Sequence, residues 1–79
     1  MSRYRDAALA RVGEFSAQIA ELEVRRAREV ARAGYHGASW SQIGAALGVT
    51  AQSAHRRFRR LVYDPATGAV WSEPPLPLG

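Results

Sequence analysis

The chain has 79 residues, enough for one small domain, and it contains no cysteine, which excludes disulfides and thiolate chemistry. Its two histidines, His36 and His55, are far apart in the chain, so neither a metal site nor any other cofactor is expected. The formal net charge is +4, and four arginines lie within residues 56–60 with no acid nearby. Such a basic cluster favours a polyanionic partner, above all nucleic acid.

Hydropathy and the start of the chain favour a protein without a membrane partner. The longest strongly apolar stretch, residues 43–49, is far shorter than the roughly 18 residues that a membrane span needs. Residues 3–6 carry charges where a secretory signal would begin to build its apolar region. We therefore expect a cytoplasmic, nucleoid-associated protein.

Residues 5–33 are predicted to form one long helix, because Ala, Leu, Glu and Arg dominate and proline is absent. From Ala8 onward, apolar residues alternate four and three apart, as in a coiled coil. This pattern predicts a dimer seam: Val12, Phe15, Ile19 and Leu22. A helix of this length spans roughly 43 Å, more than the rest of such a small domain can cover. We expect a homodimer through this seam; the alternative is that the helix folds back as part of a monomeric bundle.

A second helix is predicted after a short connection. Gly34 suits the left-handed position that ends the first helix. Ser39 and Gln42 have the spacing of a capping box, so the second helix should begin at Ser39 as its N-cap. Gly48 should end that helix, and Val49 is expected to plug the corner that follows. A small residue, Gly44 or Ala45, should let the next helix approach closely.

A third helix is predicted from Ala51 to about Val62, with Thr50 as its cap. Its apolar face would carry Ala54, Phe58 and Leu61. Its opposite face would carry amide and guanidinium groups, from Gln52, Arg56 and Arg60.

Residues 62–71 predict a β-hairpin. Asp64 and Pro65 start its turn, and Gly68 takes the positive φ that closes it. Trp71 is expected to dock on the helical body, because a lone two-stranded hairpin is marginal in water. The sequence thus predicts a mainly α fold in one domain, residues 1–71, with a Pro-rich extended tail over residues 72–79.

A short helix, a glycine turn and a second helix with a polar outer face make a helix-turn-helix. Residues 39–61, SWSQIGAALGVTAQSAHRRFRRL, resemble the helix-turn-helix of sigma-factor region four and of small actinobacterial DNA-binding regulators. The likeness is confined to this segment. A sigma factor proper is excluded, because the chain has no region for core promoter opening.

The resemblance implies that residues early in the third helix face DNA bases. The base-reading residues are then Gln52, Ser53 and Arg56. A second group would contact the DNA backbone: Ser39, Ser41, Gln42, Thr50, Arg57, Arg59 and Arg60. The expected function is a sequence-selective transcriptional regulator that binds double-stranded DNA as a homodimer.

Two alternatives remain open at this stage. The helix-turn-helix or the long helix could dock on a protein, as an adaptor of the transcription machinery. The same positively charged residues would also suit a non-specific nucleoid-associated protein. Such a protein differs only in the ratio of its affinities for specific and non-specific DNA. No nucleophile–base pair or paired carboxylates come together in the sequence, so an enzyme is not expected, and no small-molecule ligand is evident.

Overall fold

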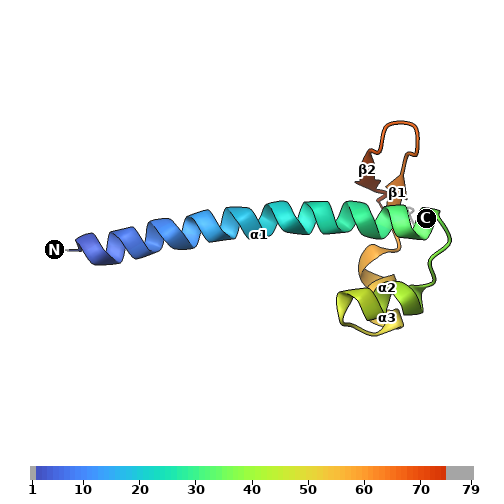
Figure 1. Ribbon diagram of the computed structural model, residues 1–79, viewed down its shortest axis with the longest axis horizontal. Helices are drawn as coiled ribbons and strands as arrows, with labels where there is room; N and C mark the ends of the chain where they lie inside the picture. The colour runs from blue at the N-terminus through green and yellow to red at the C-terminus, as the bar shows by residue number, and fades with distance from the viewer. Residues whose placement is uncertain (1, 75–79) are drawn as a thin grey trace, which may run out of the picture.

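The computed structural model describes residues 2–74, which form one long helix with the other elements packed at its C-terminal end (Figure 1). The long helix is α1, Arg3–Tyr35, and the part of the chain packed around its last turns is called the head. The head consists of helices α2 and α3 and a small antiparallel sheet, with these bounds: α2 Trp40–Leu47, α3 Ala51–Phe58, β1 Leu61–Tyr63 and β2 Val70–Ser72. The radius of gyration is 17.1 Å, against about 12 Å for a compact chain of this length, because most of α1 projects from the head.

Helix α1 is longer at both ends than the predicted 5–33. Gly34 lies inside the helix, so its predicted role as the left-handed terminator is wrong. That role belongs to Gly37, which has a φ of 97°. The amide of Ala38 donates to the carbonyl of Ala33 at 3.0 Å, and Gly37 donates to Gly34 at 3.1 Å. This pair of hydrogen bonds is a Schellman motif, which satisfies the last carbonyls of the helix.

The predicted start and end of α2 are confirmed. Ser39 accepts a hydrogen bond from the amide of Gln42, and the Gln42 side chain accepts one from the amide of Ser39, which completes the capping box. Gly48 ends the helix with a φ of 78°. The next residue, Val49, is exposed and does not plug the corner as expected. Its amide donates to the carbonyl of Gly44 at 2.9 Å, which satisfies one of the last carbonyls of α2.

The core of the head is small. Its buried residues come from all three helices: Val30, Ile43, Ala54 and Phe58. Ala54 is 0% exposed, because α3 crosses α2 at this residue. Trp40, Leu47 and Leu61 pack around this cluster and remain partly exposed. The apolar face of α3 is thus the part of the helix that packs into the core.

Helix α3 ends at Phe58, earlier than the predicted Val62. Arg59 and Arg60 form a turn, and the chain then enters β1. The carbonyl of Arg60 accepts from the amide of Glu73 at 2.8 Å, so pairing with the second strand replaces the last helical turn. Arg60 therefore does not share the helical face of Gln52 and Arg56.

The predicted hairpin is confirmed, and in it Val62 pairs with Trp71 and Tyr63 pairs with Val70. Asp64 organises its turn by accepting from the amide of Ala66 and the hydroxyl of Thr67, and Gly68 has the expected positive φ. Trp71 is exposed and donates its indole N–H to Glu73, so the expected docking on the helical body is wrong. Strand β2 includes Ser72, and the rest of the predicted tail beyond residue 74 lies outside the described residues.

Candidate nucleic-acid interface

Helix α3 presents an exposed polar face on the side away from the core. Its buried residues, Ala54 and Phe58, face α1 and α2, whereas Gln52 and Arg56 are exposed. Gln52 and Arg56 are four residues apart and therefore lie one above the other on the same face. Ser53 is half-buried at the edge of this face. The structure brings the three predicted base-reading residues together on one turn and a half of helix.

The four clustered arginines occupy two different settings. Arg56 and Arg57 belong to α3, and Arg59 and Arg60 follow it in the turn. All four are exposed, and within residues 2–74 none of them makes an ion pair. Arg57 lies over the ring of Phe58 at 5.1 Å. The face of the head that carries α3 therefore combines a polar helix with uncompensated positive charge.

Three of the side chains predicted to contact phosphates also cap helices. Ser39 and Gln42 hold each other's backbone amides at 3.1 and 2.9 Å, and Thr50 accepts from the amide of Ser53 at 3.1 Å. The hydroxyls and the Gln42 amide group still have hydrogens to donate, because only their oxygens are used in the caps. Ser41, in the first turn of α2, is exposed. These residues have a structural role beside any contact with an anion.

His55 lies at the edge of the reading face and packs against a neighbour. Its ring meets that of Trp40 edge to face, with centroids 5.3 Å apart. Trp40 is half-buried and packs on the core. This contact connects α3 to the start of α2.

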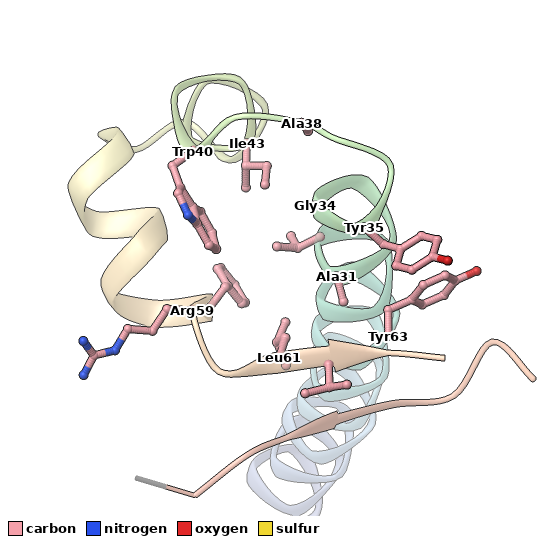
Figure 2. Close-up of a pocket in the computed structure, with 12 residues that line it drawn as sticks. Ala31, Gly34, Tyr35, Ala38, Trp40, Ile43, Arg59, Leu61 and Tyr63 are labelled. Carbon is pink, nitrogen blue, oxygen red and sulfur yellow. The ribbon is translucent and has the colours of Figure 1, made fainter. Parts of the chain in front are cut away.

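A cavity of about 390 Å³ opens between α1, α2, α3 and β1 (Figure 2). Its walls are largely apolar and aromatic, and include Trp40, Ile43 and Leu61. Arg59 also borders it, but its side chain points away from the opening, whereas Trp40 points inward. Sequence reasoning missed this cavity, because it arises from how the hairpin spans the gap between α1 and α3. The lining offers no acid–base pair for catalysis.

The contact between Tyr35 and Tyr63 was also not predicted from the sequence. Their rings lie 5.4 Å apart where the last turn of α1 meets the end of β1 (Figure 2). The ring of His36 meets Tyr35 edge to face at 5.2 Å. This aromatic group fixes the hairpin to the last turn of α1.

The predicted dimer seam is an open apolar stripe. Val12, Phe15, Ile19 and Leu22 are each between 51% and 59% exposed. Leu9 and Tyr4, toward the start of α1, are exposed as well, although the predicted seam did not include them. Nothing in the head reaches this part of the helix (Figure 1).

Two further features of residues 2–74 bear on the kind of protein this is. None of the helices in this part of the chain is long and apolar enough to cross a membrane. No group of three or more His, Asp or Glu side chains comes together there in a way that could hold a metal ion.

Comparison with known proteins finds no relative of this chain. The chain matches no family model, no curated protein and no solved structure. The likeness of residues 39–61 to bacterial helix-turn-helix segments therefore stays a prediction.

Proposed function

We propose that this chain is a double-stranded-DNA-binding protein, a small sequence-selective transcriptional regulator that acts as a homodimer. Its recognition helix is α3, which enters the major groove with Gln52, Ser53 and Arg56 toward the bases. One observation carries the proposal: α3 is anchored by Ala54 and Phe58, and its opposite face offers an amide and, one turn away, a guanidinium without an ion pair among residues 2–74.

The chemistry of that face suits base reading. Arginine binds guanine with two hydrogen bonds, and glutamine binds adenine in the same way, each worth about 1–3 kcal/mol of discrimination. Arg57, Arg59 and Arg60 and the polar N-terminal ends of α2 and α3 would contact the backbone phosphates. These contacts position the protein without reading sequence.

The homodimer follows from the limits of a single head. One recognition helix contacts few bases, so two heads related by symmetry are needed for useful selection. The exposed stripe on α1 supplies a surface on which a second copy can pack. The negative charge of Asp64 and Glu73 keeps the hairpin from being a phosphate-binding wing.

Selection from a random duplex library tests this proposal. The full chain is incubated with the library over several rounds, and the enriched sequences are read and re-bound by fluorescence anisotropy against unselected competitor. The proposal predicts enrichment of one sequence pattern with inverted symmetry. Binding without enrichment would support the nucleoid-associated alternative, and no binding at about 50 mM salt would support the protein adaptor, since phosphate contacts are strongest at low salt.

A further inference from the structure

The apolar stripe on α1 continues onto the head. The alternation that places Ile19 and Leu22 on one face leads next to Arg26, Glu29 and Ala33, four, three and four residues on. Those three residues border a groove of about 220 Å³ between α1 and α2. Its other walls are mostly apolar, and include Val30, Ile43, Ala46 and Leu47. A helix that lies along the stripe therefore runs directly into this groove.

We infer that a second copy of the chain covers this surface as an antiparallel helix, so that the start of each α1 crosses the groove of the other protomer. The inference rests on the proposed function for the dimer and adds its orientation and register. The register is centred on Ala17. It stacks Val12 on the partner's Leu22 and Phe15 on the partner's Ile19.

Charge in the seam favours this orientation over the parallel one. A parallel pair in register stacks identical residues, so Arg5, Arg26 and Glu29 would each face their own copy. In the antiparallel register, Arg5 meets the partner's Glu29, and Arg26 meets the partner's Ala8. An opposite-charge layer and an arginine–alanine layer thus replace like-charge layers, and such charge patterns set helix orientation in coiled coils.

Beside the seam, the antiparallel register brings two like charges together, at a smaller electrostatic cost than like charges inside the seam. The antiparallel register brings Arg11 near the partner's Arg25. Each of these arginines has a glutamate one turn away on its own helix, Glu14 for Arg11 and Glu21 for Arg25. Exposed flanking charges are also screened by salt far more than charges inside the seam.

The groove provides the second argument. Tyr4 is 82% exposed and Leu9 is 61% exposed, although both are large and apolar. In the antiparallel register, the partner's Ala8 lies level with Arg26 and the partner's Arg5 lies level with Glu29, at the border of the groove. In the parallel register, the partner's Arg26 and Glu29 would lie there instead. The antiparallel pair therefore brings a small apolar residue and a complementary charge to the border of the groove, whereas the parallel pair brings like charges there.

The position of the head provides the third argument. The head packs on a face of α1 that includes Ala27, Val30 and Ala31, about a quarter turn around the helix from the stripe. Helices α2 and α3 therefore hang on one side of α1 (Figure 1). The two-fold axis of an antiparallel pair is perpendicular to the helices, so it leaves the α2 and α3 helices of both protomers on the same side of the pair. A parallel pair would place them on opposite sides.

The distance between the two heads then suits DNA. In the register centred on Ala17, the head-bearing segments of the two helices lie about 40 Å apart along the pair. Recognition helices that read successive major-groove faces are separated by about 34–36 Å. The antiparallel pair thus presents two α3 helices toward one side of a duplex, roughly one turn apart.

Engineered cysteines test this arrangement, because the chain has none of its own. Ala8→Cys is made in a chain with an added tag, and Arg26→Cys in an untagged chain. The two are mixed without DNA in a glutathione redox buffer, and the products are separated on a non-reducing gel. The antiparallel register predicts a disulfide between the two different chains, in about tenfold or greater excess over either homodisulfide, since disulfides need a Cα–Cα separation below about 7 Å.

Each other outcome contradicts the inference. Homodisulfides in excess would show a parallel pair, and a monomeric mass by light scattering with no covalent dimer would show that no second copy binds. A second pair of variants, Arg5→Cys with Glu29→Cys, repeats the test one layer outward in case Arg26→Cys disturbs the head. Because no DNA is present, an antiparallel dimer that binds no duplex would contradict the proposed function and leave this inference standing.

Discussion

Gly44 of α2 lies directly against the backbone of Val49, at the corner between α2 and α3. A Cβ atom at Gly44 would stand 2.8 Å from the carbonyl oxygen of Val49 and 3.0 Å from the carbonyl carbon of Thr50. Both neighbours are backbone atoms held by the turn, so they cannot move aside cheaply. Helices α2 and α3 can therefore approach this closely only because residue 44 is glycine. This approach holds α3 with its polar face outward.

Gly44→Ala should destabilise the protein for this reason. Forcing an extra methyl group into such a contact costs about 1–3 kcal/mol. A loss of 1 kcal/mol lowers the melting temperature of a domain of this size by about 4–8 °C. Thermal unfolding followed by circular dichroism measures the effect.

Gly13→Ala is the matched control. Gly13 also lies in a helix, but a Cβ atom there meets nothing within 4 Å. Alanine should stabilise α1 by about 0.5–1 kcal/mol, because it restricts the unfolded chain and favours the helix. Equal melting temperatures for the two variants would contradict the account of the corner.

The capping box gives a second stability prediction. Ser39→Ala removes the side-chain oxygen that accepts from the amide of Gln42, and should cost about 0.5–2 kcal/mol of stability. Ser41→Ala, two residues on and exposed, should leave the free energy of unfolding within about 0.5 kcal/mol of the wild type. Urea denaturation of both variants checks this; a larger loss for Ser41→Ala would show that the cap is not what stabilises the start of α2.

These local features were predictable from the sequence, whereas those that depend on tertiary packing were not. The caps at Ser39 and Gly48 depend on a few neighbouring residues, so their spacing alone identifies them. The end of α3 at Phe58 depends on pairing between strands that are distant in sequence, and helix propensity extended the helix too far. Trp71 was expected to be buried because it is large and apolar, but its indole bonds to Glu73 at the surface.

The same distinction applies to the candidate site. The outward position of Gln52 and Arg56 follows from helical periodicity and was predicted. The loss of Arg60 from that face, the cavity beside Trp40 and the groove beside Leu47 were not, because each forms only where separate elements meet.

A charged residue in the α1 stripe should dissociate the proposed dimer. Phe15→Glu places an unpaired carboxylate in the seam, and an unpaired buried charge costs about 3–5 kcal/mol. The dissociation constant should therefore rise more than about a hundredfold, since each 1.4 kcal/mol is tenfold. Light scattering should give twice 8.6 kDa for the wild type and 8.6 kDa for the variant.

Ala17→Glu is the control for this change. It adds the same charge to the same region of α1, but it lies off the stripe and is exposed. It should leave the mass of the dimer unchanged. A wild-type chain that is monomeric at tens of micromolar, or a dimer that survives Phe15→Glu, would show that the stripe is not the contact.

The most direct test of DNA reading by α3 compares three arginine variants on the selected duplex, by fluorescence anisotropy over a salt series. Arg56→Ala should lose roughly 5- to 150-fold in affinity for that duplex and little for unselected DNA, the effect of one base contact worth about 1–3 kcal/mol. Arg60→Ala should weaken both equally and reduce the salt slope by about one, and Arg28→Ala, on the exposed part of α1, should change neither. If Arg56→Ala binds selected and unselected duplexes as the wild type does, α3 does not read bases and the central claim is wrong.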